Sequence, residues 1–380
     1  MRKLTGLLLV LMMLFTLALV ALAEDEEKEL TLGGLLFATE DPVEGQEEST
    51  PDPNAIYEND GSVLITITAT GDVTIGNDYN ARGKGLFQTE LDKQKGDINF
   101  PFRNFKDIFE QDDLTLINFE GTLTTVASPP RNKAGNQFLF KANPEFVQLL
   151  TNNSVEAVAL ENNHIMDFGE EGLNETKATL KDAGVVYACE GELGIIEIKG
   201  VQIAMLAYQT FDAYERLFEQ VPREVAEAKA KYPIVIVSFH WGAELDYVPN
   251  AKQQKMGKMA IDAGADLVLG HHSHRINPIE EYNGKYIVYS LGNFSFAGNN
   301  KPSDMSTFIF QTRFRIMDDV VTNEGFRIIP SRISSRTDYN DFIPTPYEKQ
   351  SNIDSLLSTL KKNGGKLANP VSEYPLDFPK

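Results

Sequence analysis

The stretch Asp266-Leu-Val-Leu-Gly-His-His-Ser-His274 decides how the rest of the chain is interpreted. An apolar run of strand length ends in a glycine, and three of the chain's five histidines follow within four positions. The other two, His164 and His240, also come shortly after apolar runs, at 155–160 and 234–239. In open α/β sheets, sites form just beyond the carboxyl ends of strands. Neutral imidazole binds metals and transfers protons near neutral pH, so these strand ends are where an active site is expected.

Strands and helices alternate along the chain from residue 63 onward. Apolar and β-branched runs predict strands at 63–68, 114–117, 155–160 and 234–239. Helices are expected at 104–111, from Pro144 to about 150, at 170–182, 214–229 and 252–263, and at 351–362, with a hairpin around Gly200. Extended segments follow from Tyr286 to about Ile333. This order predicts an α/β layered architecture with mixed sheets and an antiparallel C-terminal portion.

The bulk composition excludes several classes of partner. With 380 residues and 42% apolar content, the chain can bury a substantial core. Its formal net charge of -20 argues against binding nucleic acid through the phosphate backbone and against docking on anionic lipid. An acidic substrate would need a local positive centre, which a metal ion can supply. Cys189 is the only cysteine, so there is no intrachain disulfide framework.

The N-terminal sixty residues predict export. Residues 1–23 read as a secretory signal, with two basic residues, an apolar core at 7–20 and a small-residue cleavage site, although the apolar run is also marginally long enough for an uncleaved anchor. Residues 24–60 carry thirteen acidic residues against one base and are expected to be a disordered acidic linker. A folded domain at 61–345 and a C-terminal helix and tail at 346–380 complete the expected organisation. The protein is therefore expected outside the cytoplasmic membrane, secreted or anchored in the cell envelope.

Polar side chains gather at five successive strand ends. In chain order they are Asp72, Asn118, Glu120, Asn163, His164, Asp167, His240, His272 and His274. Such a mixed nitrogen and oxygen set could hold one or two divalent ions and suits Mn, Zn or Fe better than Ca or Mg. Paired ions activate water and neutralise the oxygens of a phosphoryl group in an in-line displacement. His164 would stand nearby as a general acid or as a positive partner for developing charge.

Each motif also has a purely structural interpretation. Gly71-Asp72 is compatible with a turn, Asn162-Asn163 with turn chemistry, and Trp241 with a core position. His272-x-His274 is more specific, because alternate residues of an extended segment present both rings on one face. Candidates for substrate contact are Asn118, Arg131, Lys133, Lys141 and Asn293, although exposed basic residues usually belong to the solvated surface. The combination of the motifs favours one shared site.

The ordered motifs resemble those of the bacterial capsule-synthesis CapA/PgsA-type family, which is associated with poly-gamma-glutamate capsules. The matching segments are Gly71-Asp72, Asn118-Phe-Glu120, Asn162-Asn-His164-x-x-Asp167-Phe-Gly169, His240-Trp-Gly242, Gly270-His-His-Ser-His274 and Ser290-Leu-Gly-Asn-Phe294. They span roughly residues 63–300. The family looks like a branch of the calcineurin-like metallophosphoesterases. The resemblance therefore implies a four-layer sandwich, with two mixed β-sheets flanked by helices.

The resemblance also implies a role for each site residue. By that kinship, Asp72 and His274 would ligate one ion, Glu120 would bridge, and Asn163, His240 and His272 would hold a second ion. His164 would match the catalytic histidine, with Asp167 of the same motif beside it. One departure concerns the first motif, since metallophosphoesterases usually begin with Asp-x-His and here Val73 and Thr74 follow Asp72. The lost imidazole predicts a single-metal or weakly binuclear centre. Glu120 in place of the usual aspartate is a milder departure.

Two classes of function remain open. One is an extracellular metal-dependent hydrolase of the phosphoesterase type, acting on an anionic envelope polymer or a phosphoester. The same metal-bound water could instead cleave an amide or ester, because the ligand set does not fix the bond attacked. The other class is a non-catalytic envelope component that assists poly-gamma-glutamate assembly, anchoring or export beside membrane-bound polymer synthase partners.

Overall fold

The protein is represented by a computed structural model that describes residues 56–81, 83–133 and 138–379. The expected signal at 1–23 and nearly all of the expected acidic linker at 24–60 lie outside these ranges. The described residues belong to one contact unit, Asn54–Lys380. Within them, no helix combines the length and the apolar character that crossing a bilayer would require.

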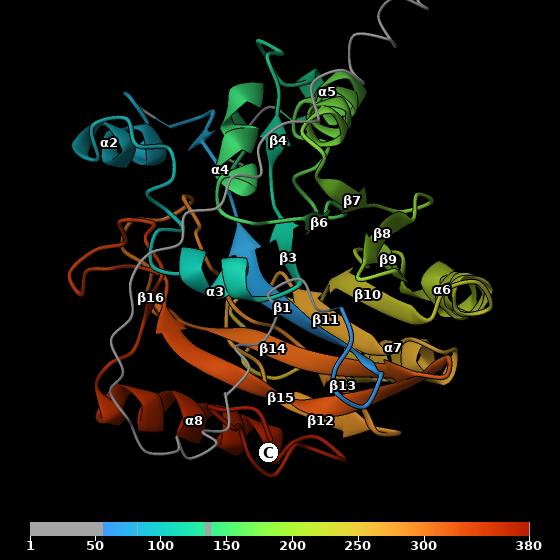
Figure 1. The fold of residues 1–380 in the computed structure, drawn as a ribbon. Coiled ribbons are helices and arrows are strands. Elements are labelled where there is room, and N and C mark those ends of the chain that lie inside the picture. The colour runs from blue at the N-terminus through green and yellow to red at the C-terminus, as the bar shows by residue number, and fades with distance from the viewer. Residues whose placement is uncertain (1–55, 82, 134–137, 380) are drawn as a thin grey trace, which may run out of the picture. The chain divides into compact units, whose positions relative to one another are not determined.

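The first sheet has seven strands (Figure 1). In spatial order these are β16 (Thr345–Pro346), β15 (Val320–Arg332), β14 (Ser306–Met317), β1 (Val63–Val73), β3 (Leu114–Phe119), β6 (Ala157–Ala159) and β7 (Val186–Ala188). Strands β1, β3, β6 and β7 are parallel, whereas β14, β15 and β16 pair antiparallel. The expected antiparallel C-terminal portion is therefore confirmed.

The second sheet has six strands. In spatial order these are β12 (Ile279–Tyr282), β13 (Lys285–Val288), β11 (Leu267–His271), β10 (Ile234–His240), β9 (Val201–Gln209) and β8 (Gly194–Ile198). The four central strands are parallel, and the two edge strands are antiparallel to their neighbours. The predicted hairpin around Gly200 is the β8–β9 pair. A small third sheet contains β2 (Asn77–Asp78), β5 (Phe140–Ala142) and β4 (Thr122–Leu123).

Helices lie on the outer faces of both large sheets. On the first sheet these are α2 (Leu86–Lys93), α3 (Lys106–Gln111), the 3-10 turn η2 (Pro144–Val147), α4 (Gln148–Thr151) and α5 (Gly169–Asp182). On the second sheet they are α6 (Tyr214–Lys229) and α7 (Ala251–Asp262). A short 3-10 turn, η1 (Arg131–Lys133), lies in the loop after β4. The last helix, α8 (Gln350–Gly364), contacts β15 of the first sheet and β12 of the second.

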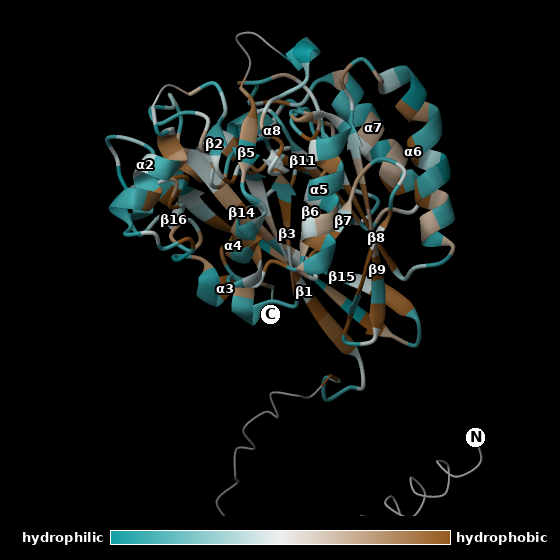
Figure 2. Cartoon of the chain, turned by 90° about the horizontal axis from the view of Figure 1, so that it is seen from above, coloured by the Kyte–Doolittle hydropathy of each residue, from teal (hydrophilic) through white to brown (hydrophobic). Residues whose placement is uncertain are grey.

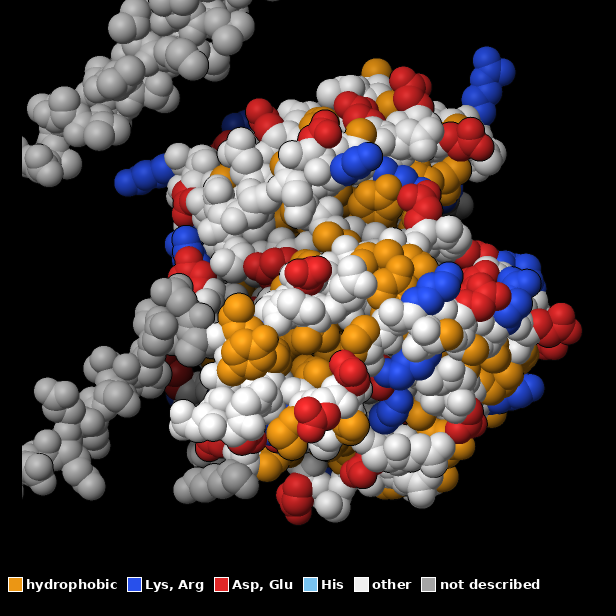
Figure 3. All heavy atoms as spheres, turned by 45° about the vertical axis from the view of Figure 1, so that its right-hand side comes forward, with side chains coloured by type: hydrophobic (Ala, Val, Ile, Leu, Met, Phe, Trp, Pro, Cys, Tyr) orange, Lys and Arg blue, Asp and Glu red, His pale blue; other side chains and the backbone are white. Residues whose placement is uncertain are grey.

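Alternation along the strands explains the layers. In β10, Ile234 and Ile236 enter the core shared by the two sheets, whereas Val235 and Val237 pack with α6 and α7. Both faces of each sheet are therefore covered, which Figure 2 shows as brown strands behind helices with teal outer faces. The order of layers is helix, sheet, sheet, helix, so the predicted four-layer sandwich is confirmed. On the face drawn in Figure 3, acidic and basic side chains are interspersed.

Candidate metal centre

The end of β1 places Asp72 at the centre of a buried polar cluster. The pairing register between β1 and β3 shifts between Ala69 and Asp72, so Val73 packs in the outer core instead of on the face of Ala69. A side chain on Gly71 would come 2.2 Å from the Gly292 carbonyl oxygen. Only glycine fits at position 71, because the backbone of β1 passes so close to that of Gly292. This close approach also lets Asp72 N donate to Gly292 O at 2.9 Å.

Four neighbours surround the Asp72 carboxylate. Asn118 Nδ2 donates to Oδ1 at 2.9 Å, and His271 Nδ1 lies 3.2 Å from the same oxygen. His274 Nδ1 lies 3.1 Å from Oδ2, and the His272 backbone N–H donates to Oδ2 at 3.3 Å. Burial favours the neutral acid, but the imidazoles of His271 and His274 hold the pKa of Asp72 well below its usual range. Asp72 is therefore a buried anion.

Glu120 is buried with both carboxylate oxygens lacking any hydrogen-bond partner among the described residues. His164 Nε2 and His240 Nε2 lie 3.7 and 3.9 Å from Oε1. Burial and the charge of Asp72 raise the pKa of Glu120 well above its usual range. A buried acid with two unpaired oxygens is costly unless a cation satisfies it.

The histidines differ in their protonation. His240 ends β10, and its Nε2 lies 3.1 Å from Nδ1 of His272. Burial, together with the neighbouring His272, lowers the pKa of His240 well below its usual range, and burial with His274 lowers that of His272 to about 4. Both rings are neutral at pH 7, which is the form that binds metal. Burial opposes protonation of His274, but Asp72 and Glu120 raise its pKa to about 9.

The backbone after β11 is strained where two ligand candidates lie. His272 has φ 90° and His274 has φ 53°, a region that non-glycine residues rarely adopt. Such conformations cost free energy and persist where surrounding contacts enforce them, typically at functional sites. Here the Asp72 carboxylate accepts from the His272 N–H and contacts the His274 ring. The same contacts that form the cluster therefore stabilise the strained backbone.

His164 is held by Asp167 with its second nitrogen toward the cluster. His164 Nδ1 lies 2.7 Å from Asp167 Oδ2, and this oxygen also accepts from Phe140 N at 2.8 Å. Lys133 Nζ lies 3.4 Å from Asp167 Oδ1. These contacts fix the ring orientation and leave Nε2 on the side of Glu120.

The donor set fits a divalent cation. Ligand atoms of Asp72, Glu120 and His274 lie within 4.8 Å of one another, as do those of Glu244, His272 and His274. Besides Glu120, the buried side-chain oxygens of Asn118 and Asn163 lack a hydrogen-bond partner among the described residues. Unsatisfied oxygens beside neutral imidazoles are the donors that a bound ion would complete.

A family profile described as "Bacterial capsule synthesis protein PGA_cap" matches residues 66–297. The chain belongs to this family. It is 32% identical over 232 residues to the PGA biosynthesis protein CapA of Bacillus subtilis (strain 168), covering 56% of this chain and 60% of that protein. It is 26% identical over 257 residues to the capsule biosynthesis protein CapA of Bacillus anthracis, covering 61% and 60% respectively. The alignments thus span about 60% of the length of these two relatives.

Solved structures give a more distant likeness. One is described as a novel phosphatase of Mycoplasma pneumoniae, with a TM-score of 0.46 at 12% sequence identity, covering 74% of this chain and 95% of that chain. The family membership confirms the resemblance to the capsule-synthesis proteins.

Not every residue expected at the site contacts it. Asn293 Oδ1 lies 2.8 Å from His274 Nδ1, and Lys133 contacts the Asn163 carbonyl at 3.4 Å. Lys141 instead donates its ammonium to Val126 O and lies over the Phe168 ring, and Arg131 is exposed on η1. The structure therefore brings Lys133 and Asn293 to the cluster, while no described contact joins Arg131 or Lys141 to it.

Two residues at the centre were not expected to be ligands. His271 is the last residue of β11, and its ring contacts Asp72. The His-x-His pattern predicts only His272 and His274 as ligands. Glu244 follows the β10 strand end by four positions, and no pattern in the sequence distinguishes it from other loop acids.

Thr74 stands at the position where the Asp-x-His motif has its imidazole. Its hydroxyl accepts a hydrogen bond from Ala297 N at 2.6 Å.

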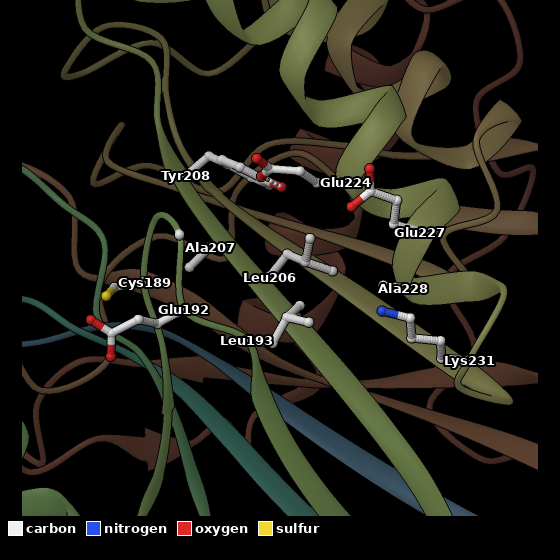
Figure 4. A pocket seen from close by; sticks show the side chains of 11 residues that line it. Cys189, Glu192, Leu193, Leu206, Ala207, Tyr208, Glu224, Glu227, Ala228 and Lys231 are labelled. Atoms are coloured by element: carbon white, nitrogen blue, oxygen red, sulfur yellow. Dashed lines mark hydrogen bonds between the residues drawn. The ribbon is translucent and has the colours of Figure 1, made fainter.

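Two cavities were compared as places where a substrate could bind. A cleft of about 380 Å³ opens beside the centre and is lined by His164, Glu244, His274 and Asn293 together with aromatic side chains. A second cavity of about 210 Å³ lies between α6, β9 and the loop that joins β7 to β8, where Tyr208 donates to Glu224 at 2.8 Å (Figure 4). Cys189 lines the second cavity, which contains none of the expected site residues. The cleft beside the centre is therefore the candidate substrate site.

Proposed function

We propose that this chain is a CapA-type capsule-synthesis protein whose centre acts as a metal-dependent hydrolase of the phosphoesterase type. The observation that carries the proposal is the Glu120 carboxylate, buried with two unpaired oxygens between His164 and His240. Family membership and the name of the Bacillus anthracis relative support a role in capsule formation, and the name of the Bacillus subtilis relative, PGA biosynthesis protein CapA, points to poly-gamma-glutamate. The substrate is then an anionic envelope polymer or a phosphoester precursor of it.

A divalent cation would supply positive charge for the substrate oxygens and acidify a water molecule. The mixed donor set favours Mn, Zn or Fe. Asp72, Glu120 and His274 would hold one ion, and Asn163, His240 and His272 a second. His271 and Glu244 are additional donors within the same cluster.

His164 has the geometry of a proton donor to a leaving group. Its Nδ1 is engaged by Asp167, so Nε2 faces the cluster and can carry the proton that a departing oxygen needs. Phe140 N and Lys133 hold Asp167, which keeps the imidazole from rotating. Asn118 orients Asp72 through its amide. His164 thus protonates the leaving group, and the other residues hold His164 and Asp72 in place. The substrate occupies the adjacent cleft.

The test separates metal binding from proton transfer. The full chain and its His240→Ala and His164→Asn variants are compared for metal content and for hydrolysis of bis-p-nitrophenyl phosphate and of a gamma-glutamyl peptide. His240→Ala should lose metal and activity together. His164→Asn should keep its metal and lose about 10²- to 10⁴-fold in rate. A folded wild-type protein that binds none of Mn, Zn or Fe would contradict the proposal.

A non-catalytic envelope role is the second candidate. It is favoured by Thr74, which occupies the place of the usual imidazole and serves a structural hydrogen bond to Ala297. In a capsule-forming host deleted for this protein, the Asp72→Asn and His164→Asn variants would be reintroduced. Capsule restored by both variants would favour the non-catalytic role, and capsule restored only by the wild type would favour catalysis.

Location and partners belong to the same proposal. The signal-like N-terminus and the capsule association support a place outside the cytoplasmic membrane, beside a membrane-bound polymer synthase. Cell fractionation and crosslinking of the full chain in such a host would test both. Recovery of the protein only from the cytoplasm would contradict them.

A further inference from the structure

Arg275, the residue after His274, is a buried cation without an acidic partner. The residue is 6% exposed, and its guanidinium donates from Nη1 to the His274 carbonyl at 2.7 Å and from Nη2 to Ser303 Oγ at 3.0 Å. Both acceptors are neutral. No carboxylate of the described residues lies within 4.0 Å of the guanidinium. A buried charge without a counter-charge is unfavourable, so an external anion would stabilise it.

Asp304, which follows Ser303 in the sequence, is engaged by other groups. Asp304 accepts from the Tyr247 hydroxyl at 2.6 Å and from Ser306 N at 2.8 Å. The Tyr247 ring lies 5.8 Å from the guanidinium carbon, and the Tyr247 hydroxyl, which donates to Asp304, also interacts with Arg275. A neutral phenol therefore stands between the guanidinium and this acid. The fork-shaped guanidinium binds carboxylate and phosphate groups well, and it stays charged at every relevant pH.

Arg275 lines the cleft that opens beside the metal centre. Lys301, which is exposed and forms no ion pair within the described residues, lines the same cleft, and Glu244 is the only acid on its wall. Glu244 also belongs to a ligand group with His272 and His274, so a bound cation would neutralise it. The cleft thus carries two cations beyond the centre.

Another part of the cleft wall is aromatic. Phe138, which is 55% exposed, stacks on Phe140, and Phe140 meets Phe296 edge-on with ring centroids 5.4 Å apart. Phe296 in turn contacts the His274 ring with centroids 4.6 Å apart. An apolar wall beside paired cations suits a chain in which anionic groups alternate with methylene segments.

We propose that Arg275 and Lys301 form an anion subsite that holds a second, non-reacting negative group of the substrate. This inference rests on the proposed function, because it places the reacting group at the metal centre. The substrate class is a polyanion with at least two negative groups, carboxylates or phosphates, separated by a short apolar linker. Binding away from the reacting atoms would give the enzyme selectivity for polymer over simple monoesters.

Calorimetric titration of the full chain tests the subsite with two probes, tri-gamma-glutamate for carboxylates and tripolyphosphate for phosphates. Arg275→Met should weaken binding of at least one probe about tenfold or more, since charge-assisted hydrogen bonds are lost. Lys301→Met, at an exposed position, should weaken it about threefold. The probe whose affinity falls identifies the anion. The fully amidated trimer should bind the wild type as weakly as the acid binds Arg275→Met.

Two controls separate charge from structure. Ser303→Ala removes the neutral partner of Arg275 and keeps the charge, so affinity should change less than twofold. Arg336→Met removes an exposed arginine that is paired with Asp338 and should leave binding unchanged. If Arg275→Met fails to fold in a thermal melt, Lys301→Glu carries the test and should weaken binding about tenfold.

Unchanged affinity for both probes in Arg275→Met and Lys301→Glu would overturn the proposal, as would a wild type that binds neither probe at millimolar concentration. Failure of the proposed function has another signature. In that case the wild type would bind no metal and hydrolyse nothing, while Arg275→Met still weakened anion binding.

Discussion

Glu120 is the residue on which the metal centre depends most. Glu120→Gln keeps the shape and removes the carboxylate that a bound cation would need, so we expect a loss of at least about tenfold in metal affinity. The fold should persist, because the change removes a buried carboxyl group that makes no hydrogen bond among the described residues. Metal analysis after dialysis and a thermal melt measure the two effects. Glu197→Gln, at an exposed position on β8, is the matched control and should alter neither.

His271 supplies an imidazole beside Asp72 that the first motif lacks. Its Nδ1 lies 3.2 Å from Asp72 Oδ1. We therefore expect His271→Ala to weaken metal binding by about 10- to 100-fold, as for a ligand or its direct support. Titration with Mn²⁺ or Zn²⁺ measures this. Full metal affinity in the variant would show that the ring only fills space.

Most of the centre could be predicted at the residue scale, because metal ligands in α/β folds follow strand ends. Asp72, Glu120, His240 and His274 converge as their positions after apolar runs suggested. His271 ends β11 as His240 ends β10, but the contact of its ring with Asp72 depends on how the two sheets pack, which the sequence pattern does not show. Arg275 was missed because its lack of a partner is a property of three-dimensional packing.

At the scale of elements, Asp112 between α3 and β3 makes stability depend on pH. Its Oδ2 accepts from Thr115 Oγ1 at 2.7 Å, and its Oδ1 is buried without a partner among the described residues. Burial first, and the charges of Glu156 and Asp113, raise its pKa from 3.8 to about 7. Between these two values the folded chain holds a proton that the unfolded chain has lost. The stability that protonated Asp112 contributes is therefore fully present below pH 3.8 and is lost as pH rises through 7.

Asp112→Asn imitates the protonated form at every pH. We expect it to raise the free energy of unfolding by about 1–2 kcal/mol at pH 8, discounted for partial exposure, and to change it little at pH 4. Urea denaturation at both pH values measures the difference. An equal effect at pH 4 and pH 8 would contradict the ionisation argument, since a simple packing change does not depend on pH.

Elements with a clear apolar period were predictable, and short ones were not. The bounds of α6 were predicted because Leu217, Val221 and Val225 recur every four residues and are buried. The end of β1 was placed too early, since the register shift before Asp72 has no marker in the sequence. The helix α2 begins at a glycine without a capping side chain, and β4 has two residues, so neither gives a periodic signal.

At the scale of the whole molecule, α8 joins the two sheets. Leu356 and Leu360 lie in the core shared by both sheets, and the helix contacts β15 and β12. We expect Leu360→Ala to lower the free energy of unfolding by about 2–5 kcal/mol, because a fully buried leucine leaves a cavity. Urea denaturation followed by tryptophan fluorescence measures the loss. Ser358→Ala, exposed on the same helix, should stay within about 0.5 kcal/mol.

The order of strands and helices predicts α/β layering with mixed sheets, and the four-layer arrangement is predictable only from the resemblance of the motifs to the family. The way in which the two sheets share the ligands is not predictable. Asp72 and Glu120 come from the ends of β1 and β3 in the first sheet, whereas His240 ends β10 and His272 follows β11 in the second. Which loops face one another across the sandwich depends on tertiary packing that a sequence pattern does not encode.

Asp72 and Glu120 come from one sheet and His274 from the other, so this group of donors assembles only after the two sheets have packed together. An ion held by these three residues would therefore be loaded late in maturation. A polypeptide threaded through a membrane before folding would therefore acquire its ion only on arrival. The local supply of metals in that compartment, more than the intrinsic ranking of affinities, would then decide which ion the mature protein carries.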